Sequence, residues 1–281
     1  MILNIILALF LANVALAEEI KILSWNVYML PKPLKFSQQS LRIEKIPEAL
    51  KDTSYDFMFF QEAFLPGFRR EMYQKFGSRY PYDIYLNRKD FFWRPMGSGV
   101  FIMSKHPFKV IDQVYYKQCA KADCYASKGS MLIESSLPSG KKVQFAITHM
   151  QSGEEQGSIR LSQIDQLKKM LLKNAKAGVP QFLSGDLNID VAEPEFQDGQ
   201  AMLGMNHAPL LGDIDYTGGF DNDCFKIHGR SPEWIDHLWF KPQGRKIASV
   251  SIKARPFEYN YKGMNCTLSD HMAIEGSISL D

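Results

Sequence analysis

Polar side chains of three chemical kinds recur where apolar segments of this sequence begin or end. They are carboxylates, carboxamides and imidazoles, namely Asn26, Glu62, His149, Asp186, Asn188, Asp236, Asp270 and His271. Carboxylate and amide oxygens suit a hard cation such as Mg²⁺, which keeps several waters and binds through one or two carboxylates. An imidazole beside such a cation can act as a general base or donate to developing negative charge. The set therefore predicts hydrolysis of a phosphate ester.

Each of these residues also has a structural interpretation when it is taken alone. A single Asn or Asp at the end of a strand is more often a turn or cap residue, and a single His is more often a structural hydrogen-bonding group. However, six separate segments carry such a residue. A sheet holds the side chains at its strand ends and in the following loops rigidly. We therefore interpret the residues together as one candidate site.

The segments that must position these residues have mainly the pattern of strands. Apolar residues alternate at Val143, Phe145 and Ile147, which is typical of a strand with one buried face. The strand-length segments are 20–27, 56–61, 99–103, 109–116, 130–134, 142–149, 181–185, 234–240, 247–253 and 271–279. Helical periodicity is found at 41–50 and 159–172. The excess of strands predicts an α/β protein with large sheets covered by helices.

The composition is that of a folded globular chain. Of the 281 residues, 45% are hydrophobic and 23% are charged, which excludes disordered, collagen-like and coiled-coil chains. A formal net charge of +2 is too balanced to predict a nucleic-acid-binding protein from charge alone.

The first 17 residues differ from the rest of the chain. They carry no charged side chain and end in Ala15-Leu16-Ala17, a small-x-small cleavage pattern that Glu18 follows directly. Their apolar run is shorter than a membrane span. The pattern predicts a secretory signal peptide over 1–17, a catalytic domain over 18–281, and a secreted or periplasmic location. A buried first helix or an uncleaved anchor is the alternative.

The four cysteines permit disulfides in an exported chain. They are Cys119, Cys124, Cys224 and Cys266, and three pairings are open to them. Cys119 and Cys124 could pair locally, and Cys224 and Cys266 could pair over a long loop. Free buried thiols are the alternative, whereas the spacing does not suit zinc.

Six motifs, taken in order, resemble those of the endonuclease/exonuclease/phosphatase superfamily. They are Ser24-Trp25-Asn26-Val27, Phe60-Gln61-Glu62, Thr148-His149, Ser184-Gly185-Asp186-Leu187-Asn188, Ile235-Asp236-His237 and Ser269-Asp270-His271. The match runs from about residue 20 to residue 279. Further segments resemble the neutral sphingomyelinase branch in its secreted bacterial form, at 26–31, 97–100, 104–107, 126–129 and 148–151.

The resemblance implies a fold and roles for the main site residues. The fold is a four-layer α/β/β/α sandwich, in which two mixed β-sheets pack face to face with helices outside. Glu62 would bind Mg²⁺ directly with Asn26 beside it, and Mn²⁺ or Co²⁺ are the alternative ions. His271 would take a proton from the attacking water, and His149 would donate to the phosphoryl oxygens.

The remaining residues of the set would support these groups. Asp186 and Asn188, two apart in an extended run, would position the nucleophile or hold a second ion. Asp236, inside its strand, would support a catalytic imidazole. Asp270, at the start of the last strand, would orient another group such as His149.

The implied reaction is hydrolysis of sphingomyelin to ceramide and phosphocholine by a protein that we expect to act as a monomer. The substrate is a phospholipid at a membrane surface, so we expect peripheral membrane contact and no stable nucleic-acid complex. Lys128 would lie near the phosphate. Secreted bacterial members enter membranes with an aromatic hairpin before the last motif, whereas residues 255–264 here lack an adjacent Trp-Phe pair. The other apolar patches are 29–31 and Phe91-Phe92-Trp93, although an aromatic triplet is more often core.

Two other functions fit the same residues. A secreted nuclease of the superfamily would share every catalytic residue but should present a basic track to phosphates. The adjacent basic pairs, Arg69-Arg70, Lys141-Lys142 and Lys168-Lys169, and the modest net charge give little support for such a track. The second alternative is a membrane-binding protein with a vestigial phosphoesterase site, against which the intact set of site residues argues.

Overall fold

The computed structural model describes residues 17–31, 38–87 and 94–281. The predicted signal peptide therefore lies, except for its last residue, outside the described residues, and so does the triplet Phe91-Phe92-Trp93. Within the described residues, no helix is both long and apolar enough to cross a membrane.

Strands make up most of the regular structure. The strands are β1 (Glu18–Asn26), β2 (Phe57–Gln61), β3 (Tyr82–Tyr85), β4 (Phe101–Ser104), β5 (Phe108–Tyr115), β6 (Gly129–Ser136), β7 (Lys142–His149), β8 (Gln181–Asp186), β9 (Asn206–His207), β10 (Leu210–Leu211), β11 (Asp236–Lys241), β12 (Ile247–Arg255), β13 (Glu258–Tyr261), β14 (Met264–Thr267) and β15 (Ala273–Leu280). The helices are α1 (Gln39–Leu50), α2 (Pro66–Phe76), α3 (Gly157–Lys173) and α4 (Pro194–Leu203), with short 3₁₀ helices η1 (Lys121–Tyr125), η2 (Glu154–Gln156) and η3 (Asp223–Phe225).

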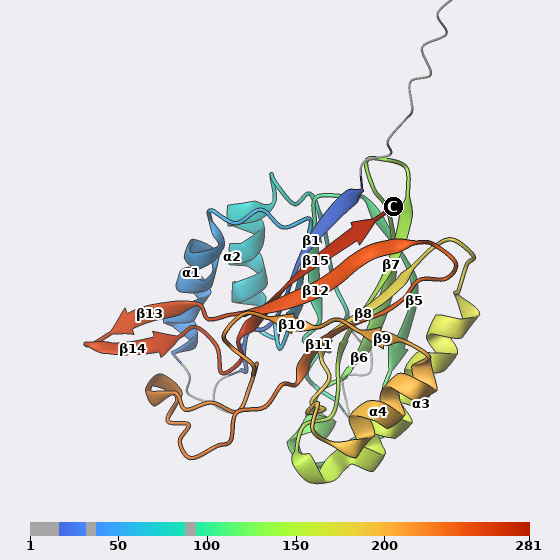
Figure 1. The fold of residues 1–281 in the computed structure, drawn as a ribbon. Coiled ribbons are helices and arrows are strands. Elements are labelled where there is room, and N and C mark those ends of the chain that lie inside the picture. Colours follow the sequence, from blue (N-terminus) through green and yellow to red (C-terminus); the bar gives the residue numbers. More distant parts are fainter. Residues whose placement is uncertain (1–16, 32–37, 88–93) are drawn as a thin grey trace, which may run out of the picture.

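The strands form two large mixed sheets and one small hairpin. The seven-stranded sheet has the order β10-β12-β15-β1-β2-β4-β3, and the six-stranded sheet has the order β5-β6-β7-β8-β11-β9. The pairs β1/β2 and β7/β8 are parallel, whereas β15 and β11 run antiparallel to β1 and β8. The hairpin β13–β14 projects away from the body of the molecule (Figure 1).

The two large sheets pack face to face, and the helices lie outside them (Figure 1). Between the sheets, the ring of Phe145 lies 4.8 Å from Phe57 and 5.3 Å from Phe59, centroid to centroid. Helices α1 and α2 cover the outer face of the seven-stranded sheet, and α3 and α4 cover that of the six-stranded sheet. The predicted four-layer α/β/β/α sandwich is therefore confirmed.

One end of the sandwich collects the ends of the strands that carry polar residues. Parallel β1 and β2 both finish at this end, as do parallel β7 and β8. Along β8, Phe182 faces the core between the sheets, and Asp186 continues the same inward row because side chains alternate along a strand. The inward row of β7 likewise runs from Val143 through Phe145 to His149. Each row is apolar inside the sandwich and polar at its end.

Among the strand boundaries that differ from the sequence prediction, two concern site residues. Strand β11 begins at Asp236, so this residue starts the strand and does not lie inside it. Strand β15 begins at Ala273, so Asp270 and His271 precede it and lie in a loop. A residue in a loop is not restricted to one face of the sheet, which lets these two side chains reach the same site.

Two helices, α2 and α4, are absent from the sequence prediction. Both begin at a proline, Pro66 and Pro194. Proline is favoured at the first helical position because its fixed φ suits the helix and its missing N–H is not needed there. These prolines are the signal that could have located both helices.

Both disulfides that the cysteine spacing allows are formed. Cys119 pairs with Cys124, and Cys224 pairs with Cys266. The expectation of disulfides is confirmed, one of the three open pairings is the one formed, and the alternative of free thiols is wrong. The second disulfide ties η3 to strand β14 of the projecting hairpin.

Candidate active site

Asn26, at the end of β1, joins the two sheets at the polar end of the sandwich. Its Nδ2 donates to Asp186 Oδ2 at 2.9 Å and to Glu62 Oε1 at 3.2 Å. Its Oδ1 accepts from the backbone N–H of Tyr28 at 3.0 Å. Glu62 follows β2 and Asp186 ends β8, so one amide links carboxylates from both sheets. In this arrangement Asn26 orients the carboxylates with its nitrogen, while its oxygen faces the loop after β1.

Three residues at the site have backbones in the left-handed region. The φ angles of Tyr28, Glu62 and Asn188 are 49°, 52° and 53°. Non-glycine residues rarely adopt this conformation, and it costs free energy that the surrounding structure must supply. The backbone of Glu62 packs closely against Gly99. A Cβ at Gly99 would lie only 3.0 Å from the Glu62 backbone nitrogen. The close approach explains the glycine in the 97–100 motif.

Asp186 and Asn188 are held by a turn and not by an extended run. The backbone N–H of Asn188 donates to Asp186 Oδ1 at 2.9 Å, and Asn188 Nδ2 donates to the Met150 carbonyl at 3.2 Å. The prediction that the two side chains share one face of an extended segment is therefore wrong, because Asn188 has a positive φ. Gly185, just before them, is required because a Cβ there would overlap the Thr148 carbonyl oxygen.

His271 is bonded to one carboxylate and faces a second. Its Nδ1 lies 2.8 Å from Asp236 Oδ2, and its Nε2 lies 3.7 Å from Asp186 Oδ2. Burial alone would lower the pKa of His271, but the charges of Asp236 and Asp186 outweigh burial and raise the pKa well above its usual value. Because Asp236 accepts the Nδ1 proton, the Nε2 atom is the one directed at the site.

His149 has the opposite environment. Its Nε2 lies 3.0 Å from the ammonium of Lys128, 3.4 Å from Asp186 Oδ2 and 3.8 Å from Glu62 Oε1. Burial, followed by the charge of Lys128, lowers the pKa of His149 well below its usual value. A neutral imidazole that accepts from Lys128 carries its proton on Nδ1, and Nδ1 is buried with no hydrogen-bond partner among the described residues.

The ammonium of Lys128 is buried, and each of its three protons has an acceptor. It contacts Asp123 Oδ2 at 2.7 Å, the Met150 carbonyl at 2.8 Å and His149 Nε2 at 3.0 Å. Asp123 belongs to η1, between the disulfide-bonded Cys119 and Cys124. Sequence reasoning did not select Asp123, because nothing in the spacing of a loop carboxylate distinguishes it from a turn residue.

Asp270 lies in the loop before β15. Its Oδ1 accepts from the Ser269 hydroxyl at 3.5 Å, and no hydrogen bond joins it to His149 within the described part of the chain. The expected orientation of His149 by Asp270 therefore has no support. Instead, Asp270 acts on Glu62 through charge. Burial, with the repulsion of Asp270 second, raises the pKa of Glu62 to about 7.

The donor set suits a divalent cation. Glu62 Oε2 and Asp236 Oδ1 are buried and have no hydrogen-bond partner among the described residues. Buried carboxylate oxygens without donors cost free energy, which a bound cation would remove. Asp186, Asp236 and His271 also offer ligand atoms that all lie within 4.8 Å of one another. Because Asp236 already holds His271, the unpaired oxygens make Glu62 the better first ligand, with Asp186 nearby.

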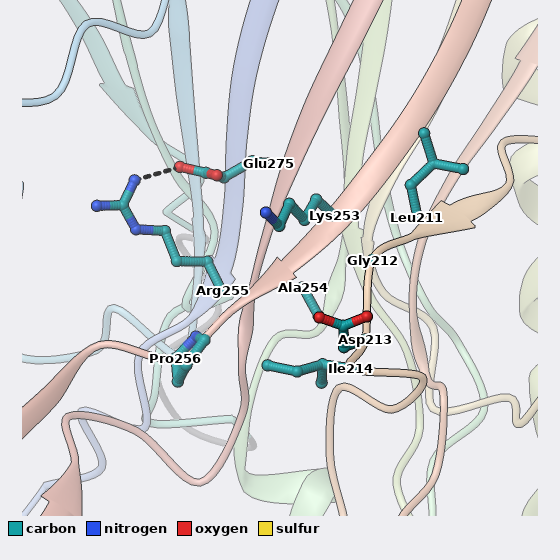
Figure 2. Close-up of a pocket in the computed structure, with 9 residues that line it drawn as sticks. All are labelled: Leu211, Gly212, Asp213, Ile214, Lys253, Ala254, Arg255, Pro256 and Glu275. Atoms are coloured by element: carbon teal, nitrogen blue, oxygen red, sulfur yellow. Dashed lines mark hydrogen bonds and ion pairs between the residues drawn. The ribbon is translucent and has the colours of Figure 1, made fainter.

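A surface cavity elsewhere in the molecule has a different character. It has a volume of about 440 Å³ and is lined by residues 211–214, residues 253–256 and Glu275 (Figure 2). Arg255 is paired with Glu275 at 2.5 Å, so these two charges of the cavity neutralise each other. The predicted site residues lie at the polar end of the sandwich and not in this cavity.

Comparisons with known proteins indicate the family of this chain. A model described as the Endonuclease/Exonuclease/phosphatase family matches residues 23–271. A phospholipase C of Staphylococcus aureus is 26% identical over 92% of this chain and 86% of its own length. A sphingomyelinase C 2 of Leptospira interrogans is 28% identical over 79% of this chain, which spans 39% of that relative.

A comparison with solved structures shows the same fold in a known protein. A crystal structure of a beta toxin mutant from Staphylococcus aureus with bound magnesium ions has a TM-score of 0.77 to this chain. The two are 23% identical, and the match covers 92% of this chain and 99% of that one. The resemblance that the motifs indicate is confirmed. This chain therefore belongs to the endonuclease/exonuclease/phosphatase family, in which it is a metal-dependent hydrolase of phosphodiester bonds.

Proposed function

We propose that this protein is a secreted, Mg²⁺-dependent phosphodiesterase that hydrolyses sphingomyelin to ceramide and phosphocholine. It acts as a monomer on a phospholipid at a membrane surface. The printed names of the similar proteins, phospholipase C and sphingomyelinase C, support the substrate class. The cleavage pattern at Ala15-Leu16-Ala17 and the two disulfides support secretion, because disulfides persist in oxidising compartments.

The observation that carries the proposal is the His271–Asp236 pair, in which His271 Nε2 faces the carboxylate of Asp186. Asp236 fixes the Nδ1 proton of His271, so Nε2 is free to accept a proton from water. The water oxygen then forms the new bond to phosphorus, and the bond from phosphorus to the ceramide oxygen breaks. The ceramide oxygen takes up a proton, and phosphocholine is the second product.

The metal is expected at Glu62, with Asn26 and Asp186 beside it. When bound, Mg²⁺ would polarise a phosphate oxygen and offset the carboxylate charge that keeps His271 protonated. The chain supplies further positive charge next to this position. Lys128 is buried 3.0 Å from His149, and its positive charge would attract an anionic phosphate.

Charges around the site favour a choline head group over a nucleic acid. Glu233, Asp190 and Glu154 lie close enough that, after burial, the latter two carboxylates raise the pKa of Glu233. Carboxylates at this position repel a polyanion and suit the positive charge of choline. These charges support the proposal of a lipid substrate with a cationic head group.

The adjacent basic pairs do not form a track that leads to the site. Arg69 donates to the carbonyls of Ala63 and Phe64. Lys142 begins β7, the strand that reaches the site only at its other end, and it pairs with Glu134. Lys169 pairs with Asp165 on α3. The nuclease alternative, which needs a continuous basic surface, is therefore the weaker proposal.

Membrane contact is proposed through the projecting hairpin. Strands β13 and β14 carry Tyr259, Tyr261 and Met264, and the side chain of Met264 is among the exposed large hydrophobic groups. Lys262 at the turn lies over the Tyr261 ring at 5.3 Å and suits anionic head groups. The patch at 29–31 is less suitable, because Met29 is fully buried.

Parallel assays with two substrates test the proposal. The protein is incubated with sphingomyelin vesicles and with plasmid DNA, each with Mg²⁺ or with EDTA. We expect phosphocholine release from the vesicles with Mg²⁺ and no release with EDTA, and no nicking of the plasmid. Nicking without phosphocholine release would replace the sphingomyelinase proposal by the nuclease. Metal-dependent turnover of neither substrate would support a vestigial site.

A further inference from the structure

Arg42 is a buried cation that the chemistry above does not use. It projects from α1 and its side chain is fully buried. A buried guanidinium costs free energy unless its N–H donors have acceptors. The acceptors of Arg42 therefore indicate which parts of the chain it holds in place. No motif in the sequence marks it, since it lies 16 residues after Asn26 in a helix that otherwise covers the sheet.

The guanidinium of Arg42 joins two loops that carry opposite halves of the site. Its Nη1 donates to the carbonyls of Val27 at 2.8 Å and Leu268 at 3.0 Å, and its Nη2 donates to Tyr28 at 2.5 Å. Val27 and Tyr28 directly follow Asn26. Leu268 directly precedes the Ser269-Asp270-His271 motif. We call Arg42 and these three carbonyls the Arg42 clamp.

A second set of bonds connects the clamp to the side chains of the site. Tyr28 has a φ of 49°, and its N–H holds the side-chain oxygen of Asn26. On the other loop, the Ser269 hydroxyl donates to the Asn26 carbonyl at 2.6 Å and accepts from the His271 N–H at 3.3 Å. A change in the clamp therefore reaches Asn26 from one loop and His271 from the other.

Two aromatic rings pack against the guanidinium of the clamp. The guanidinium lies 4.9 Å from the centroid of Phe225 and 5.8 Å from that of Tyr28. Phe225 follows Cys224, whose disulfide to Cys266 fixes η3 against the chain just before Leu268. Rings over a guanidinium favour its charge and exclude water from its bonds. The clamp is thus a rigid junction.

The geometry points to Arg42 as a positioning residue for phosphodiester hydrolysis. It holds the strained loop after β1 and the loop before β15 at the separation at which Glu62, with Asn26, and His271 share one site. The inference rests on the phosphodiesterase site proposed above but not on its preference for sphingomyelin.

The test compares Arg42→Met and Arg42→Lys with a matched control, Arg79→Met. Arg79 donates to the carbonyls of Lys51 and Thr53 and lies over the rings of Phe76 and Tyr80, but it is at the opposite end of β2 from Glu62. Turnover is measured with a soluble phosphodiester, bis(p-nitrophenyl) phosphate, and Mg²⁺ binding by calorimetry without substrate. Circular dichroism checks the fold of each variant.

We expect Arg42→Met to lower kcat by about 10²-fold with little change in KM, the usual effect of displacing reacting groups by about 1 Å. Its Mg²⁺ affinity should fall by at least about tenfold, as when groups that orient a metal ligand are removed. Arg42→Lys should recover part of both losses, and Arg79→Met should show neither.

Two outcomes would overturn the inference. In the first, folded Arg42→Met keeps the kcat and Mg²⁺ affinity of the parent protein. In the second, both Arg42 variants lose the fold, which would make Arg42 a residue of general stability. Failure of the parent protein to cleave sphingomyelin would contradict the proposed substrate alone, because neither readout here uses that lipid.

Discussion

His149 and His271 lie in the same site, yet their pKa values are shifted in opposite directions. His149, from the six-stranded sheet, lies 3.0 Å from the Lys128 ammonium. His271, from the loop before β15 of the seven-stranded sheet, lies 2.8 Å from the Asp236 carboxylate. Each also faces the carboxylate of Asp186, at 3.4 Å and 3.7 Å respectively.

The difference shows that burial sets the direction of the pKa shift at His149, whereas the carboxylate partners outweigh burial and set it at His271. Burial favours the neutral form of both rings, because a low-dielectric environment penalises charge. At His149 the neighbouring cation acts in the same direction, and the pKa falls well below its usual value. At His271 the carboxylates act against burial, and the pKa rises. One site thus contains an imidazole with a raised pKa and an imidazole with a lowered pKa.

The largest effect should follow removal of the basic imidazole. We expect His271→Ala to lower kcat by at least ~10²-fold, the usual contribution of a general base, without loss of the fold. The matched control is His106→Ala, since His106 bonds Asp56 at the other end of β2 and is not part of the site. The measurement is the steady-state kcat of both variants and the parent protein with Mg²⁺. Full metal-dependent activity in His271→Ala would refute the assignment.

Loss of the Glu62 carboxylate should act mainly on the metal. Glu62 Oε2 has no hydrogen-bond partner in the described structure, and we expect Glu62→Gln to weaken Mg²⁺ binding by at least about tenfold. The measurement is a Mg²⁺ titration by calorimetry, with Glu195→Gln as a control, because Glu195 is a buried carboxylate held by Arg160 away from the site. An unchanged Mg²⁺ affinity would count against Glu62 as a ligand.

Exchanging the partner of His271 should remove the contrast between the two rings. Asp236→Asn replaces a charge that raises the pKa of His271, so that pKa should fall toward or below its ordinary value of about 6.5. The imidazole would then lose its proton at a lower pH than in the parent protein. An NMR titration of the ring protons measures both histidines at once. If the pKa of His271 does not fall, Asp236 is not its main partner.

The smallest effect should follow removal of the cation beside His149. In Lys128→Met the repulsion that lowers the pKa of His149 is absent, so the pKa should rise but stay below the usual value, because burial is the larger cause. The same titration should show a smaller change at His271. A KM increase for the phosphodiester would support a role of Lys128 near the phosphate. An unchanged pKa of His149 would contradict the claim that the charge of Lys128 contributes to lowering it.

Sequence patterns could predict the strands that carry the site but not the contacts within it. The alternation that ends at His149 locates an inward-facing row, and its last residue must lie at the edge of the sheet. The left-handed turn at Asn188 and the loop position of His271 depend on tertiary contacts that no periodicity records. Residues such as Asp123 and Arg42 act through neighbours that are distant in sequence, so their types alone could not identify them.

Hydrolysis of sphingomyelin in ¹⁸O-labelled water tests the central claim most directly. The account predicts that water activated at His271 attacks phosphorus, so one ¹⁸O atom should appear in phosphocholine and none in ceramide. Mass spectrometry of the two products, with Mg²⁺ and with EDTA, reads the result. Label in ceramide, or labelled phosphocholine that forms equally well in EDTA, would contradict metal-dependent cleavage of the P–O bond at this site.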